Sequence, residues 1–163
     1  MVKEYKQHKR GKAAQEHWTK MQRSTMETPA WRSLSTAAQS AYVWIKFEWK
    51  GPNANNNGKI QVSLRQLAQC MGINPETAGR AMLDLQKAGF TVVTRCAQLG
   101  VQGRASGHLL EITELPLPGD ERGQGRRLFE KWMPGNDFPI VRPQIRNPKG
   151  GDPPSRKKAT IDR

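Results

Sequence analysis

The sequence predicts a mainly helical domain with a small β-hairpin, flanked by an extended N-terminal arm and an extended C-terminal tail. Three observations lead to this fold class. Apolar residues recur at the helical spacing of three and four in three segments, and each segment follows a residue that caps helices. Two stretches rich in β-branched and apolar residues, 90–96 and 108–113, enclose a glycine-rich loop. Eight of the eleven prolines follow residue 115, which disfavours long helices and central strands there.

The chain is strongly basic. It has 163 residues, of which 27 are lysine or arginine and 14 are aspartate or glutamate, so its formal charge is +13. This charge favours an acidic partner, although solubility or a basic tail would also account for it. The longest apolar run, 41–45, is far shorter than the roughly 20 residues of a membrane-spanning helix. The N-terminal lysines precede no apolar stretch and the chain has only two cysteines, so we expect a cytoplasmic protein without a secretory signal or membrane segment.

The first long helix is expected to begin after Ser35, which is a good N-cap. Its apolar face consists of Ala38, Ala41, Tyr42, Ile45 and Trp49. Gly51, Pro52 and the asparagine-rich run 53–58 then end the helix, because these residues favour turns. The alternation of Ile60 and Val62 predicts a short strand.

Two further helices are expected on either side of a turn at Gly72. In the first, Ser63 is the N-cap and Gln66 completes a capping box. The apolar face of this helix consists of Leu64, Leu67, Ala68 and Met71. In the second, Asn74 is the N-cap and Gly89 ends the helix. The apolar face of this helix consists of Ala78, Ala81, Met82 and Leu85.

Charge, proline and periodicity divide the chain into three parts. We interpret residues 1–16 as a flexible basic arm, residues 17–115 as the folded domain and residues 116–163 as a proline-rich extended tail that docks in part. The tail residues too apolar for a linker are Leu128, Phe129, Trp132, Met133 and Phe138. Together with Trp18, Trp31, Trp44, Phe47 and Trp49, the tail aromatics exceed what a small core needs. They predict either a homodimer surface or a tail that wraps over the domain.

The middle of the chain resembles the winged helix-turn-helix of bacterial DNA-binding regulators over residues 59–113. The resemblance rests on the segment SLRQLAQCMGINPETAGRAMLDLQKAGF, residues 63–90. The family's packing, turn and projecting positions are occupied here by Leu67, Ala68, Gly72, Thr77 and Arg80. Residues 29–42 also look like the first helix of small helix-turn-helix proteins found on plasmids, phages and integrated mobile elements. The resemblance implies a winged helix-turn-helix fold and a bacterial cytoplasmic protein that is nucleoid-associated when bound to double-stranded DNA.

The resemblance implies that the helix after Asn74 reads the major groove. Since its apolar face is turned to the core, its opposite face presents Glu76, Thr77, Gly79, Arg80 and, further along, Leu83 and Asp84. Arg80 can form two hydrogen bonds to a guanine edge, worth about 1–3 kcal/mol of discrimination. The alternative is a solvated arginine that pairs with an acidic residue one helical turn away. Thr77 and Asn74 are expected to contact phosphates or base edges, and a capping role does not exclude such contacts.

Five residues complete the expected DNA interface. Glu76 either accepts a hydrogen bond from a cytosine or complements the helix dipole. Gly79 leaves a gap through which the backbone can approach DNA. Arg65 matches the family position that reaches flanking phosphates. Gln102 and Arg104 lie in the predicted hairpin loop, the wing, where they can follow the DNA backbone or enter the minor groove.

The sequence does not suggest an enzyme, a cofactor or a metal site. The histidines, His8, His17 and His108, have no carboxylate or cysteine at ligand spacing. Cys70 and Cys96 resemble small apolar residues more than a redox pair. The glycines of the hairpin loop match neither nucleotide-binding spacing, because no Gly-Lys-Ser/Thr follows and no helix opens after them.

Together these features predict a sequence-specific DNA-binding protein, acting as a transcriptional regulator of a mobile element or of accessory genes. A replication initiator or a recombination directionality factor would use the same domain, and the location of the binding site separates these roles. An RNA-binding or protein-interaction adaptor is the alternative of another class. A strong salt dependence on duplex DNA with one preferred sequence would set that alternative aside.

Overall fold

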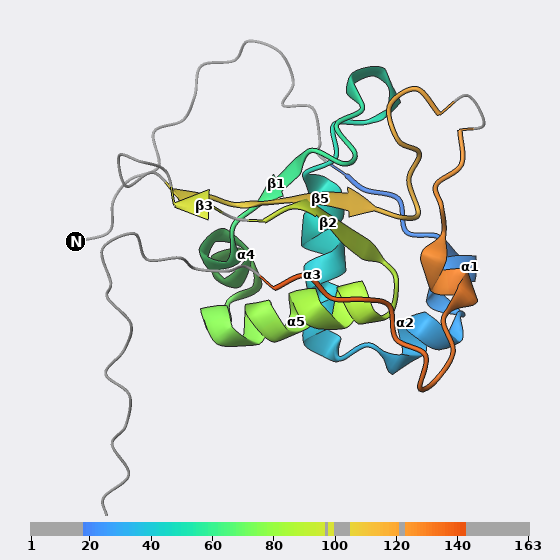
Figure 1. Cartoon of the computed structure of the whole chain (residues 1–163), viewed down its shortest axis with the longest axis horizontal. Helices are drawn as coiled ribbons and strands as arrows, with labels where there is room; N and C mark the ends of the chain where they lie inside the picture. The colour runs from blue at the N-terminus through green and yellow to red at the C-terminus, as the bar shows by residue number, and fades with distance from the viewer. Residues whose placement is uncertain (1–17, 97, 100–104, 121–122, 143–163) are drawn as a thin grey trace, which may run out of the picture.

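The computed structural model describes residues 18–96, 98–99, 105–120 and 123–142 (Figure 1). The helices are α1 (Arg23–Met26), α2 (Pro29–Ser33), α3 (Thr36–Phe47), α4 (Leu64–Met71) and α5 (Pro75–Lys87), with 3-10 helices at Pro52–Ala54 and Leu128–Lys131. The strands are β1 (Ile60–Val62), β2 (Thr91–Arg95), β3 (Gln98–Leu99), β4 (Ala105–Ser106) and β5 (His108–Ile112). The protein is therefore helical with a small antiparallel sheet, which confirms the predicted combination.

Side-chain caps begin the three predicted helices at the expected residues. The hydrogen bonds run from the amide of Ala38 to Ser35 Oγ at 3.2 Å, from that of Gln66 to Ser63 Oγ at 3.1 Å, and from that of Thr77 to Asn74 Oδ1 at 2.7 Å. Each bond satisfies an amide that has no partner inside its helix. The local chemistry of the sequence thus determines where these helices start.

The segment before α3 contains a short helix that the periodicity of the sequence did not predict. The structure has a short helix, α2, whose Thr28 cap accepts a hydrogen bond from the amide of Trp31 at 3.2 Å. Leu34 then adopts an extended backbone with ψ 141°, so the helix stops and a new one starts after Ser35. The break turns Trp31 and Leu34 into the core, where both are buried.

The strand predicted from Ile60 and Val62 joins the hairpin to form one sheet. The strand order is β1-β5-β2, and both neighbouring pairs are antiparallel. Leu110 in the central strand faces Ile60 on one side and Val93 on the other. The pairing of β2 with β5 is irregular between Val93 and Arg95, and the short strands β3 and β4 then pair with each other.

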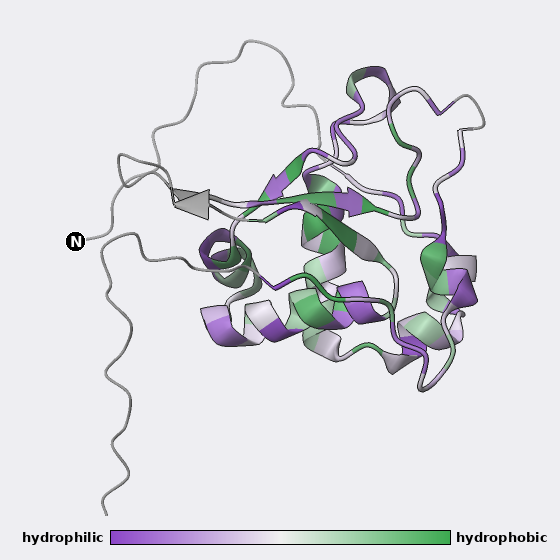
Figure 2. Ribbon diagram, in the orientation of Figure 1, coloured by the Kyte–Doolittle hydropathy of each residue, from purple (hydrophilic) through white to green (hydrophobic). Residues whose placement is uncertain are grey.

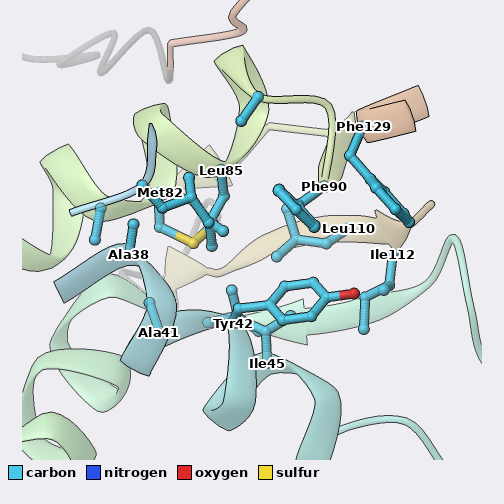
Figure 3. Packing of buried hydrophobic residues seen from close by; sticks show 14 of the residues in the cluster. Ala38, Ala41, Tyr42, Ile45, Met82, Leu85, Phe90, Leu110, Ile112 and Phe129 are labelled. Carbon is cyan, nitrogen blue, oxygen red and sulfur yellow. The ribbon is translucent and has the colours of Figure 1, made fainter. Parts of the chain in front are cut away.

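The hydrophobic core lies between this sheet and the helices α3 and α5 (Figure 3). The rings of Tyr42 and Phe90 meet edge to face, with centroids 5.2 Å apart. The ring of Trp31 lies edge to face with both, at centroid distances of 5.6 Å. The core also contains Ala38, Ala41, Ile45, Met82, Leu85, Leu110 and Ile112. Figure 2 shows hydrophobic residues gathered where the sheet and helices face each other. This packing holds one face of α5 and leaves the other in solvent.

The chain after residue 115 packs against this core. Phe129 is buried and stacks on Phe90, with ring centroids 4.7 Å apart and planes 2° apart. Further along, the amide of Phe138 donates a hydrogen bond to the carbonyl of Lys87 at 2.9 Å. Met133, by contrast, is 65% exposed. An aromatic residue from the predicted tail thus completes the core of the helical domain.

Candidate nucleic-acid interface

The helices α4 and α5 are joined by a tight turn at Gly72. This glycine has φ 67°, a left-handed backbone conformation that favours glycine. The amide of Ile73 donates a hydrogen bond to the carbonyl of Ala68 at 3.0 Å, which closes the end of α4. Asn74 then caps α5. Because α5 packs against both α3 and α4, its direction relative to the domain is fixed.

The face of α5 opposite the core carries two charged side chains. Ala78, Ala81, Met82 and Leu85 are buried, as their spacing predicted. The side chain of Arg80 is 67% exposed and that of Glu76 is 80% exposed. Both project from the N-terminal half of α5, on the side that faces solvent. These two residues therefore define the outward face of α5.

Arg80 and Glu76 form an ion pair in the free protein. Nη2 of Arg80 lies 3.0 Å from Oε1 of Glu76, one helical turn away. An exposed pair of this kind contributes at most about 1 kcal/mol to stability. The guanidinium can therefore exchange Glu76 for another acceptor at a small cost in free energy. Until it does so, the ion pair keeps the guanidinium on the outward face.

Asn74 and Thr77 serve as a cap and its partner at the start of α5. Oδ1 of Asn74 accepts the hydrogen bond from the amide of Thr77 at 2.7 Å. Asn74 is exposed, whereas Thr77 is half-buried. The cap uses the oxygen of Asn74, and its side-chain NH₂ is a donor that the cap does not use. Of the two, Asn74 is the better placed for contact with a ligand.

Gly79 lies on the flank of α5 and not at the centre of the outward face. It is half-buried, and a Cβ built on it would lie 3.8 Å from Cδ1 of Leu64 in α4. The close approach of this backbone to DNA, which the sequence suggested, would therefore occur at the side of the helix. Arg65 is exposed in the first turn of α4, next to Leu64.

Two of the predicted DNA contacts, Gln102 and Arg104, lie outside the described residues. The basic arm and the basic residues at the C-terminal end also lie outside them. The described part of the hairpin consists of β2 and β5, together with the short pair β3 and β4. Of the predicted site residues, Glu76, Gly79 and Arg80 line one groove together with Leu64, the chain neighbour of Arg65, and Asn74 caps the same helix.

A groove of about 360 Å³ runs along the flank of α5. It is lined by Leu64, Pro75, Glu76, Gly79, Arg80, Met82, Leu83, Gln86, Val93, His108, Val141 and Arg142. Burial lowers the pKa of His108 from its usual value, which favours the neutral imidazole. No sequence pattern assigns a role to Arg142, because an irregular chain has no periodicity that would place it beside a helix.

The described residues show no candidate metal centre. They contain no group of three or more histidine, cysteine, aspartate or glutamate side chains that could hold a metal ion. Cys70 and Cys96 are both free thiols, the first exposed and the second half-buried. Within the same residues, no helix has the length and apolar character needed to cross a lipid bilayer.

Comparison with known proteins gives no family for this chain. No protein-family model matches it, and neither a search of curated proteins nor a search of solved structures finds a match.

Proposed function

We propose that this protein binds double-stranded DNA sequence-specifically through a winged helix-turn-helix domain, with α5 as the recognition helix. The observation that carries the proposal is the outward face of α5. Arg80 and Glu76 project there from a helix that α3 and α4 hold from behind. A helix fixed in this way can enter a groove without rearranging the domain.

The dimensions of α5 suit the major groove. The groove is about 12 Å wide and admits one α-helix. With 13 residues, α5 is about 20 Å long, and its N-terminal half is the exposed part. In the proposed complex, Arg80 leaves Glu76 and forms two hydrogen bonds to a guanine, worth about 1–3 kcal/mol of discrimination. The exposed Arg65 contacts a phosphate beside the groove.

The order of the elements supports the winged form of this domain. A strand, β1, precedes α4 and pairs with β5, so the sheet leads directly into the two-helix unit. The strands β2 and β5 follow α5, and the chain between them contains the predicted wing residues Gln102 and Arg104. We propose that this connection contacts the DNA backbone or the minor groove.

The net charge of +13 would give the protein affinity for any nucleic acid, whereas contacts from α5 would determine which DNA sequence it prefers. If about six cations neutralise phosphates, the logarithm of the affinity falls with the logarithm of salt concentration at a slope of about −5. We assign the protein to the transcriptional regulation of a mobile element or of accessory genes, following the sequence resemblance. It would act without catalysis, in the cytoplasm.

The test begins with selection of duplexes from a random pool by the full chain, followed by binding assays on the preferred duplex. The proposal expects one preferred sequence and a steep salt dependence. Equal binding to every duplex, or a preference for single-stranded RNA, contradicts it. Crosslinking in cells would then map the sites. Sites at promoters support regulation, whereas repeats at an origin or an attachment end would assign the protein to replication or excision.

A further inference from the structure

The segment Phe138–Arg142, which we call the strap, is attached along α5. At its start, the amide of Phe138 donates to the carbonyl of Lys87 at 2.9 Å. Near its end, the amide of Val141 donates to Oε1 of Gln86 at 2.8 Å. Gln86 is a buried residue of α5, so its side chain is held in place and fixes the position of Val141.

The close contact between Phe138 and Gly89 fixes the start of the strap. A Cβ built on Gly89 would lie 2.7 Å from Cε2 of the Phe138 ring, so the ring occupies the space that a side chain would need. Gly89 also has φ 78°, which an L side chain rarely adopts. The start of the strap is therefore held against the C-terminal end of α5.

The end of the strap lies along the flank of α5. Val141 and Arg142 line the same groove as Pro75, Glu76 and Gly79. The strap thus runs antiparallel to α5, and Figure 1 shows its orange trace crossing the molecule toward α4. The chain consequently leaves Arg142 beside the outward face of α5, where Arg80 projects.

The rim of the groove at this point is positively charged. Its ionic side chains are Arg80, Arg142 and Glu76, and Arg142 is exposed. Gathering like charges in one place favours an anionic partner.

We propose that the strap is a second DNA-contacting element, which delivers Arg142 to a phosphate beside the groove that α5 enters. This inference rests on the proposed function, because it assigns the strap to the same duplex. The partner chemistry is the phosphodiester backbone of double-stranded DNA. The strap would add affinity and salt dependence but not a preferred base.

The experiment uses the full chain and the duplex that it prefers. Arg142→Gln removes one cation. A strap-release variant, Gln86→Met with Phe138→Ala, keeps every charge but removes two attachments of the strap. Arg23→Gln is the matched control, because Arg23 is an exposed arginine on α1, far from the N-terminal end of α5 (Figure 1). Thermal unfolding of each variant establishes that it is folded at the binding temperature.

We expect Arg142→Gln to weaken binding about fivefold at 0.15 M salt and to make the salt slope shallower by about one. The strap-release variant should weaken binding at least as much, although its charge is unchanged, and both should prefer the wild-type sequence. Arg23→Gln should bind as the wild type does. If the full chain selects a duplex but Arg142→Gln binds it as tightly as Arg23→Gln, the strap makes no DNA contact.

Two other results would also overturn the inference. Tighter DNA binding by the strap-release variant would mean that the strap covers the interface and competes with DNA. Binding of the full chain to anionic vesicles in preference to duplex DNA, lost with Arg142→Gln, would assign the strap to a membrane surface. Failure of the full chain to prefer any duplex would instead contradict the proposed function, so the two failures are distinguishable.

Discussion

The ammonium group of Lys46 lies 2.6 Å from Oε2 of Glu114, and the two side chains are only 4% and 1% exposed. The hydroxyl of Tyr42 donates to the same carboxylate oxygen at 2.6 Å, and that of Thr25 donates to Oε1 at 2.7 Å. Lys46 also donates to the carbonyl of Lys20 at 2.7 Å. This buried cluster ties the segment before α2 and the turn after β5 to α3, which supports α5 from behind.

The cluster determines the charge of Glu114. Burial on its own raises the pKa of this carboxyl, but the hydrogen bonds from Lys46, Thr25 and Tyr42 outweigh burial and bring the pKa below its usual value. Burial and the neighbouring Glu114 charge raise the pKa of Tyr42 well above its usual value, so its hydroxyl keeps the proton that it donates. The folded state therefore prefers an ionised Glu114.

We predict that stability falls in acid through Glu114. Because its pKa is lower in the folded chain than in the unfolded chain, its contribution is complete above the usual pKa of 4.5 and is lost as pH falls through the folded value. Thermal unfolding of the wild type and of Glu114→Gln from pH 7 to pH 3 measures this. The gap between their Tm values should narrow below about pH 4.5. A gap that stays constant would contradict the assignment.

A second prediction concerns the other member of the pair. Lys46→Met leaves Glu114 as a buried charge without its cation, which should cost about 3–5 kcal/mol in the free energy of unfolding. The control is Glu27→Gln, which removes the exposed pair between Arg23 and Glu27 on α1. That change should cost at most about 1 kcal/mol. Urea denaturation at pH 7 measures both, and equal costs would mean that burial does not strengthen the first pair.

Phe129 should carry much of the stability that the segment 123–142 contributes. Its buried ring stacks on Phe90 at 4.7 Å, so Phe129→Ala should cost about 3–5 kcal/mol. Met133→Ala in the same segment removes a side chain that is mostly exposed, and should change stability by less than about 0.5 kcal/mol. Urea denaturation measures both changes. If Phe129→Ala lowered the free energy of unfolding as little as Met133→Ala, this segment would not belong to the cooperative core.

The contact between Gly89 and Phe138 predicts a difference between two glycine substitutions. Gly89 and Gly72 have similar positive φ angles, 78° and 67°, but only at Gly89 would a Cβ meet a neighbour within 4 Å. Gly72→Ala should therefore cost about 1–2 kcal/mol from backbone strain alone. Gly89→Ala should cost about 1–3 kcal/mol more, because the Phe138 ring must move. Equal costs in urea denaturation would show that the strap yields freely at this point.

Local signals in the sequence predicted most of the helical fold. Ser35, Ser63 and Asn74 act within three residues of the amides that they cap, and Gly72 and Gly89 adopt the turns that their lack of a side chain allows. The burial of α5 followed from the spacing of its apolar residues. Arg80 was accordingly expected on the outward face, and its exposure agrees with that expectation.

Contacts between distant parts of the chain were less predictable. The pairing of Ile60 with Leu110 joins β1 to the sheet, but neither residue's local pattern specifies its partner. Glu114 showed no periodicity that would mark it as a buried ligand of Lys46. The place of Arg142 was not predictable for the same reason, because it depends on the attachment of the strap to Gln86.

A base-reading role for Arg80 predicts a specific change in the discrimination between duplexes. The most direct measurement is the ratio of the Kd on a scrambled duplex to the Kd on the preferred duplex, at one salt concentration. The control Arg23→Ala removes an arginine from a similar exposed ion pair on α1.

For Arg80→Ala, the ratio should fall about tenfold relative to the wild type, because the preferred duplex loses the two hydrogen bonds to its guanine and the scrambled duplex does not. For Arg23→Ala, the ratio should stay unchanged. An Arg80→Ala variant that bound both duplexes more weakly by the same factor would contradict the base-reading role, since an arginine that contacts only phosphates gives that result.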